Sequence, residues 1–180
     1  MGLGETSLKW RLAIMLQFLG FLLGIAAVSS TYISAAEVIP NREHHVGFWD
    51  ICFDTQTYGC QDYPEYLSSI GEDADWVYAC RGLVVVSLIA GVFGMLVSIY
   101  LAYMASGIHM ASLVTAVLNF LAVVSGLIGS IVFLVNSLQI LKDQLQMDVY
   151  PSWSFAVIII GLSFYFLAAI THIFELCTAN

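Results

Sequence analysis

Two cysteines, Cys52 and Cys60, offer the clearest chemistry in this sequence of 180 residues. Seven residues separate them, and a tight hairpin can bring such a pair to the Cα separation of about 4.4–6.8 Å that disulfides usually have. Closing so short a ring stabilises a loop by about 2–3 kcal/mol in the chain-entropy picture. Because disulfides persist in oxidising compartments, the pair predicts a loop outside the cell. The alternative is two unpaired thiols.

The other two cysteines, Cys80 and Cys177, have no evident partner in the sequence. Cys177 follows an apolar segment closely, and juxtamembrane cysteines are sometimes palmitoylated. The simpler expectation for Cys177 is an inert buried thiol.

Metal and catalytic chemistry find little support. His44 and His45, with Glu37 and Glu43 nearby, are the best metal candidates, but adjacent side chains on a strand point in opposite directions. The sequence contains no Ser-centred elbow, HExxH motif or phosphate-binding loop. We therefore expect no metal, no cofactor and no enzymatic activity.

Acidic residues are concentrated in one segment, since nine of the thirteen lie between Glu37 and Asp75. Such a segment would repel phosphates, which argues against nucleic acid as a partner, and it suits cations or a basic partner surface. Asp62 and Glu65, shortly after Cys60, are the candidate cation-facing residues. The alternative is that the charges only keep the segment soluble.

The elements that must position these residues are apolar segments long enough to cross a membrane. The chain is 60% hydrophobic and only 10% charged, against about 25% charged in soluble proteins. No Asp, Glu, Lys or Arg occurs over 12–36, 82–141 or 149–174. One crossing needs about 20 apolar residues, so the longest run holds two crossings joined by a turn at 106–109. We expect four spans, at about 12–33, 83–104, 111–138 and 153–173.

The amide and imidazole side chains inside these spans are isolated ones, namely Gln17, Asn119, Asn136 and His172. Isolated amides in a bundle more often join helices than conduct ions. Because no Asp, Glu, Lys or Arg lies within a span, the usual machinery of a proton-coupled transporter is missing. Gly20 and Gly24 have a spacing that lets helices approach closely, although chance gives the same spacing.

Orientation follows from the charges and the cysteine pair together. Lys9 and Arg11, ahead of the first span, favour a cytoplasmic N-terminus. The same start could belong to a signal peptide cleaved after Ser34-Ala35-Ala36, but the apolar stretch exceeds a typical h-region of about 7–15 residues. Basic residues on the other side weaken the charge argument, and the cysteine pair decides. We expect a multi-pass plasma-membrane protein with both termini in the cytoplasm.

Two segments then lie outside the cell, a long one at about 34–81 and a short one at about 139–152. The long segment contains a hairpin signal, with a strand, a turn and a return strand at 46–53, 54–57 and 58–60. Residues 65–79 lack strand alternation and predict a short helix that leads into the second span.

Residues 45–52, His45-Val46-Gly47-Phe48-Trp49-Asp50-Ile51-Cys52, together with Cys60, resemble the W-GLW-C-C signature of the claudin superfamily. That superfamily includes claudins, peripheral myelin and epithelial membrane proteins, lens membrane protein and calcium-channel gamma subunits. Residues 81–87 resemble the start of the second claudin span, with Arg81 at the position of the loop-closing arginine. Residues 150–155 resemble the fourth-span entry of gamma subunits and lens membrane protein. The resemblance covers essentially the whole chain.

The resemblance implies an all-α membrane protein with a small extracellular β-sheet. Residues 1–180 would form one claudin-like domain, a left-handed four-helix bundle under an antiparallel sheet. Gly47, Phe48 and Trp49 would anchor the sheet at the lipid boundary, where tryptophan is favoured by its apolar body and single N–H. Arg81 would bond backbone carbonyls or acids of the same loop; alternatively, it is a flanking charge that snorkels.

The sequence departs from the family pattern at several positions. Tyr32 stands in place of the signature's first tryptophan, and Phe48 replaces the usual leucine. The end, Cys177-Thr178-Ala179-Asn180, lacks the PDZ-binding terminus typical of claudins, and no Asn-x-Ser/Thr acceptor occurs. Scaffold anchoring and N-glycosylation are therefore not carried over.

Two functions follow from the resemblance. The first is a structural or interaction protein at cell–cell junctions, which serves adhesion or a paracellular barrier with its extracellular loop. Its partners would be the lipid bilayer and like or related membrane proteins in cis or in trans. The alternative, favoured by the fourth-span entry, is an auxiliary gamma-like subunit that docks on an ion channel and modulates it.

Overall fold

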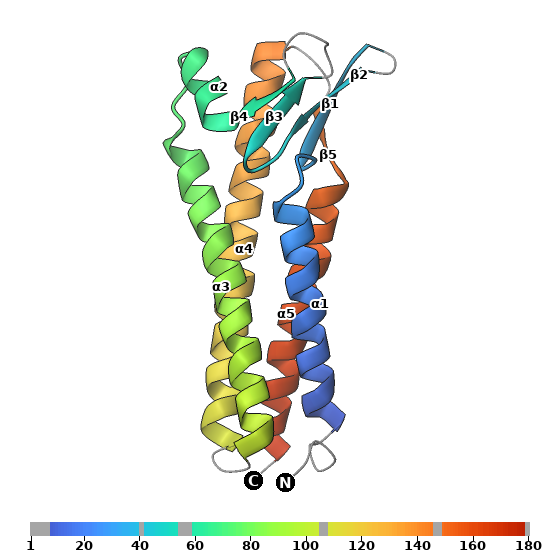
Figure 1. Cartoon of the computed structure of the whole chain (residues 1–180), viewed down its shortest axis with the longest axis vertical. Helices are drawn as coiled ribbons and strands as arrows, with labels where there is room; N and C mark the ends of the chain where they lie inside the picture. The colour runs from blue at the N-terminus through green and yellow to red at the C-terminus, as the bar shows by residue number, and fades with distance from the viewer. Residues whose placement is uncertain (1–7, 40–41, 54–58, 105–107, 146–148, 179–180) are drawn as a thin grey trace. The chain divides into compact units, whose positions relative to one another are not determined.

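Four long helices dominate the computed structural model, which describes residues 8–39, 42–53, 59–104, 108–145 and 149–178 (Figure 1). They are α1 (Leu8–Val28), α3 (Asp75–Met104), α4 (Ile108–Leu145) and α5 (Trp153–Thr178). Each is long and apolar enough to cross a membrane. The four spans predicted from the charge-free runs are confirmed, and with them a multi-pass membrane protein.

Large apolar side chains are exposed along all four long helices, for example Met15, Phe93, Val117 and Phe174. Exposing them to water would cost about 25 cal/mol for each Å² of apolar surface. Lipid chains remove that cost, so the outward faces of these helices are suited to a bilayer.

The helix ends differ from the predicted spans. α1 ends at Val28 rather than at 33, because the chain leaves the helix to enter the sheet. The helix predicted over 65–79 is wrong as a single element: α2 (Tyr63–Ser69) ends, and α3 begins separately at Asp75. Gly71 separates them with a φ of 79°, the left-handed conformation that glycine adopts readily after a helix. Of the predicted turn at 106–109, only residues from Ile108 onward are described, and they are helical.

A five-stranded antiparallel sheet has the order β4-β3-β2-β1-β5. Its strands are β1 (Ser34–Ile39), β2 (Arg42–Val46), β3 (Asp50–Phe53), β4 (Cys60–Asp62) and β5 (Val149–Pro151). The fold class, helices with a small antiparallel sheet, is as predicted. The single strand predicted over 46–53 is wrong, because Gly47 donates its N–H to the Asp50 carbonyl at 2.9 Å and the chain reverses there. The predicted turn at 54–57 lies outside the described residues.

The chain forms two compact units. The sheet unit comprises 25–84 and 127–159, and the helical unit comprises 1–24, 85–126 and 160–180. In the helical unit the buried residues of each helix follow a three-four spacing, as in Trp10, Ala13, Gln17 and Gly20 of α1. This heptad spacing is typical of left-handed helix packing.

Glycines bring helices of this unit close together. A Cβ built on Gly20 would lie 2.9 Å from the carbonyl oxygen of Gly161 on α5, and one on Gly24 would lie 2.9 Å from a Leu88 methyl carbon on α3. The spacing of Gly20 and Gly24 is therefore used for close approach, to two different helices.

Candidate functional site

Arg81 joins three elements of the sheet unit. It lies in the second turn of α3, and its Nε donates to the Phe48 carbonyl at 2.6 Å. Its Nη2 donates to the Trp49 carbonyl at 2.9 Å and to Asp62 Oδ1 at 3.2 Å. A planar guanidinium suits this divergent set of acceptors, which a lysine could not satisfy together. We call Arg81, the turn Gly47-Phe48-Trp49 and Asp62 the arginine clamp.

Gly47 begins the turn that Arg81 holds. A Cβ at this position would lie 2.5 Å from the Ser30 carbonyl oxygen and 2.6 Å from Thr31 Cα. Both neighbours are backbone atoms, which cannot rotate away as a flexible side chain can. The close approach of two backbone segments therefore explains why glycine stands here.

The Trp49 side chain makes two contacts, one with a backbone carbonyl and one with the Arg81 guanidinium. Its indole N–H donates to the Val28 carbonyl at 3.0 Å, and the Arg81 guanidinium carbon lies 4.9 Å from its ring centroid. The side chain is still 40% exposed. An apolar ring with one satisfied N–H and an exposed face fits the boundary between lipid and water.

Phe48 points the other way, into an aromatic cluster. It is fully buried, and its ring centroid lies 4.5 Å from that of Phe133 on α4. Tyr63 and Trp76 complete the cluster, at 5.8 Å and 5.7 Å from Phe133. Burying aromatic rings of this size supplies much of the packing energy of a small core, so Phe48 fixes the turn from within.

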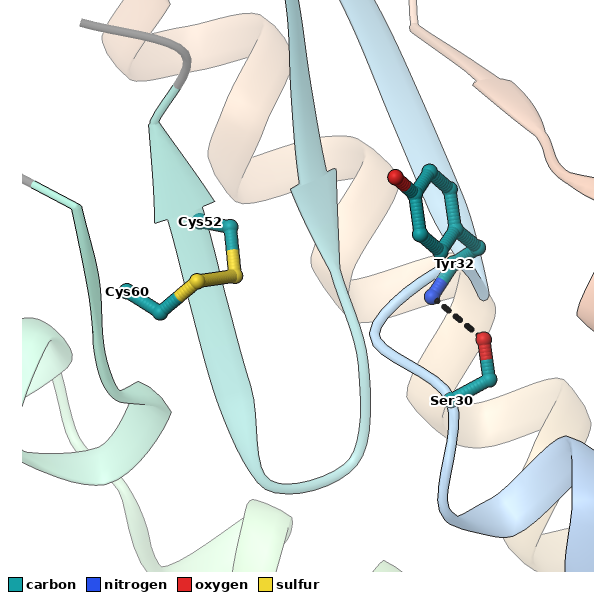
Figure 2. Close-up of a disulfide and its surroundings, with 4 residues drawn as sticks. All are labelled: Ser30, Tyr32, Cys52 and Cys60. Atoms are coloured by element: carbon teal, nitrogen blue, oxygen red, sulfur yellow. Dashed lines mark hydrogen bonds between the residues drawn. A yellow bond between two sulfur atoms is a disulfide. The ribbon is translucent and has the colours of Figure 1, made fainter. Parts of the chain in front are cut away.

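The predicted disulfide joins Cys52 to Cys60 (Figure 2). The two residues are register partners in β3 and β4, with Cα atoms 4.0 Å apart. Because Asp62 lies two residues beyond Cys60, the bond also holds the strand that brings Asp62 to Arg81.

Tyr32, at the place of the signature's first tryptophan, packs its ring at 4.1 Å from that of His45 and at 6.0 Å from that of Trp153. Its backbone N–H donates to the Ser30 hydroxyl at 3.1 Å (Figure 2). Tyr32 is thus an exposed aromatic residue that packs against two other rings.

The two candidate cation-facing residues lie in different surroundings. Asp62 is 43% exposed and forms the ion pair with Arg81 described above. Glu65 is exposed in the first turn of α2, where a carboxylate is favoured by the helix dipole. Glu72, Asp73 and Asp75 are exposed further along the chain.

The remaining candidates are not brought together. His44 lies edge-on to Phe53 and His45 lies against Tyr32, so the neighbouring imidazoles have different partners. In the described part of the chain no cluster of three or more metal-ligating side chains occurs. Cys80 is buried, whereas Cys177 is exposed. The expectation of a buried thiol at Cys177 is therefore wrong; the last turn of α5 carries it outward.

Tyr63 was not predicted as a site residue. Burial raises the pKa of its phenol above the ordinary value, because the charged form would be desolvated. Its hydroxyl has no hydrogen-bond partner among the described residues. One local signal was available: Tyr63 stands directly before Pro64, and proline favours the first turn of a helix.

A family model described as PMP-22/EMP/MP20/Claudin family matches residues 11–172. The match includes every residue of the arginine clamp and both cysteines of the disulfide. A search of curated proteins returned no match to this chain.

Proposed function

Because the chain belongs to the PMP-22/EMP/MP20/Claudin family, we propose that this tetraspan membrane protein acts at contacts between cells, in adhesion or in a paracellular barrier. Family membership also points to a non-enzymatic protein. The family match runs through both compact units, which supports treating residues 1–180 as one claudin-like domain.

The observation that carries the proposal is the construction of the sheet unit. One small sheet is held by the disulfide, the arginine clamp and the hydrogen bond from the Trp49 indole to the Val28 carbonyl. Such pre-organisation lowers the entropic cost of binding a partner. Disulfides persist outside the cytosol. We therefore place the sheet unit outside the cell, at the plasma membrane, with both termini in the cytoplasm.

The function is tested by expressing the chain with a fluorescent tag in cells that lack junctions. Contacts between two expressing cells should carry more than twice the fluorescence of contacts between one expressing and one non-expressing cell, because two labelled membranes alone give about a factor of two. A factor of about two or less between the two kinds of contact would contradict adhesion in trans.

An auxiliary channel subunit is the second candidate. An apolar groove of about 220 Å³ between α1 and α3 is lined by Phe21, Leu88, Ile89, Val92 and Phe93. A groove of this kind suits the side chains of a neighbouring transmembrane helix. Uniform surface fluorescence, with co-purification of a large channel subunit that is lost on Leu88→Trp, would favour this role over adhesion.

We also propose that the acidic surface of the sheet unit attracts cations. Glu65 should contribute more than Asp62, because Arg81 already neutralises Asp62. Glu65→Gln should lower the preference for cations over anions across an expressing cell layer, and Glu175→Gln serves as an equal change of charge in the helical unit. If the cation selectivity of both Glu65→Gln and Asp62→Asn equals that of the wild type, the acidic residues serve only to keep the segment soluble.

A further inference from the structure

Helix α3 carries a row of small buried residues at heptad spacing, Ser87, Gly91, Gly94 and Ser98. At both serines the row meets polar groups of other helices. The Ser87 hydroxyl donates to the Ala122 carbonyl on α4 at 2.6 Å. The Ser98 hydroxyl lies 3.3 Å from His172 Nε2 on α5, and the Ser98 carbonyl accepts from Trp10 Nε1 on α1 at 3.0 Å.

Between these serines, the two glycines face polar side chains. A Cβ at Gly91 would collide with the hydroxyl of Tyr165 on α5, and a Cβ at Gly94 would lie 3.3 Å from Asn119 Oδ1 on α4. The glycines thus leave room on α3 for a phenol and an amide. We call this region, with Gln17 of α1, the polar seam.

The polar groups at the glycines lack partners. Asn119 and Gln17 are fully buried, and Tyr165 is nearly so. Neither amide, nor the Tyr165 hydroxyl, has a hydrogen-bond partner within the described ranges. Gln17 lies one turn before Gly20, whose Cβ position is 3.5 Å from the Tyr165 ring, so Gln17 belongs to the same face of α1.

Buried polar groups in proteins are almost always hydrogen-bonded, and ordered water supplies the missing bonds where side chains do not. Gly91 and Gly94 are about 4.5 Å apart along the helix axis, at a rise of about 1.5 Å per residue. One direct hydrogen bond spans about 2.8 Å, whereas two bonds through one water span up to about 5.6 Å. The Tyr165 hydroxyl and the Asn119 amide face glycines one turn apart on α3 and make no direct hydrogen bond with each other, so a water between them would supply both with a partner.

The chemistry of the seam selects a neutral ligand. Amides and phenols both donate and accept, as water does. No Asp, Glu, Lys or Arg occurs over 12–36, 82–141 or 149–174, so a bound ion would be uncompensated in a medium of low dielectric. We propose that the interior of the helical unit is a hydration site, in which water bridges Tyr165, Asn119 and Gln17 between the helices.

Hydroxyl-radical footprinting of the full chain in lipid nanodiscs tests this, because radiolysis activates bound water beside buried side chains. Labelling rates are divided by the rate of the same residue in the unfolded chain. Tyr165 should then be labelled several-fold faster than Phe133, a fully buried ring in the aromatic cluster. Equal protection of Tyr165 and Phe133 would show a dry seam and overturn the proposal.

Asn119→Leu removes one side of the bridge. It should lower Tyr165 labelling toward the level of Phe133. The matched control is Asn136→Leu on the same helix, whose amide donates to the Val132 carbonyl and lies outside the seam; it should leave Tyr165 labelling unchanged. Tyr165 labelling that is the same in wild type and Asn119→Leu would overturn the bridge. The wild-type comparison decides alone if Asn119→Leu does not fold.

Discussion

Trp49 donates its indole N–H to the carbonyl oxygen of Val28 at 3.0 Å, and Val28 is the last residue of α1. The last carbonyls of a helix have no partner within it. The turn after β2 thus closes the end of the helix that precedes β1. One hydrogen bond couples the first span to the sheet, and the same indole lies over the clamp arginine.

Trp49→Phe keeps an aromatic ring over Arg81 but removes the indole N–H. We expect a loss of about 1 kcal/mol in the free energy of unfolding, the net contribution of one such bond, as measured by thermal denaturation in detergent. Trp153→Phe is the matched control, because Trp153 is 53% exposed. An equal loss in both variants would contradict the capping role of Trp49.

Arg81→Lys keeps the positive charge and removes the planar guanidinium with its several N–H donors. We expect it to lower stability by about 1.5–3 kcal/mol, the range for hydrogen bonds to charged groups. Asp62→Asn should cost at most about 1 kcal/mol, because the carboxylate is half exposed and solvent screens the pair. A double-mutant cycle separates the ion pair from the carbonyl bonds. If Asp62→Asn proved the more damaging change, the ion pair rather than the carbonyl bonds would hold the turn.

Gly47→Ala and Gly82→Ala should act with opposite signs. The first places a Cβ against backbone at Ser30 and Thr31, and overpacking of this kind costs about 1–3 kcal/mol. Gly82 lies within α3 with nothing within 4 Å of its Cβ position, so alanine should stabilise the helix by about 0.5–1 kcal/mol. Chemical denaturation of both variants checks the pair. Destabilisation by both would indicate a general intolerance of side chains.

Tyr63→Phe should change the response to alkaline pH. Burial raises the pKa of Tyr63 above its ordinary value of 10.0. The folded state therefore prefers the neutral phenol, and this contribution to stability is present below pH 10 and lost as the pH rises above it. We expect Tyr63→Phe to be as stable as the wild type near pH 7. Above pH 10 the variant should lose less stability than the wild type loses. Tyr78→Phe, at an exposed position of α3, should decline as the wild type does.

The charge-free runs alone predicted four spans, because lipid rather than water is the solvent that suits such long apolar segments. The hairpin cysteines were also predictable, since their spacing and the flanking strand residues are local signals. Helix ends were less accessible: α1 stops at Val28 although Ser29 to Ile33 continues without charge. What ends it is the Trp49 bond and strand pairing, contacts from distant residues that no local pattern contains.

β1 and β5 were missed for a related reason. Ser34, Ala35 and Ala36 pair with both β2 and β5 and are all buried, and a strand buried on both faces loses the alternation that marks a half-buried strand. Val149–Pro151 is too short to show a period. For Arg81, the sequence predicted only the kind of partner, namely backbone carbonyls or acids of the same loop. The β3–β4 register decides that its guanidinium holds Phe48, Trp49 and Asp62 together.

The clamped sheet unit should gather the protein at contacts between cells. The measurement is the ratio of tagged protein per membrane, taken as half the signal at contacts between two expressing cells, to protein on the free surface, at matched surface levels. We predict a ratio above one for the wild type and for Arg11→Gln, an exposed arginine of the helical unit, and a fall toward one for Arg81→Gln. A ratio of one in the wild type, or an undiminished ratio in Arg81→Gln, would show that the clamped sheet unit does not act at these contacts.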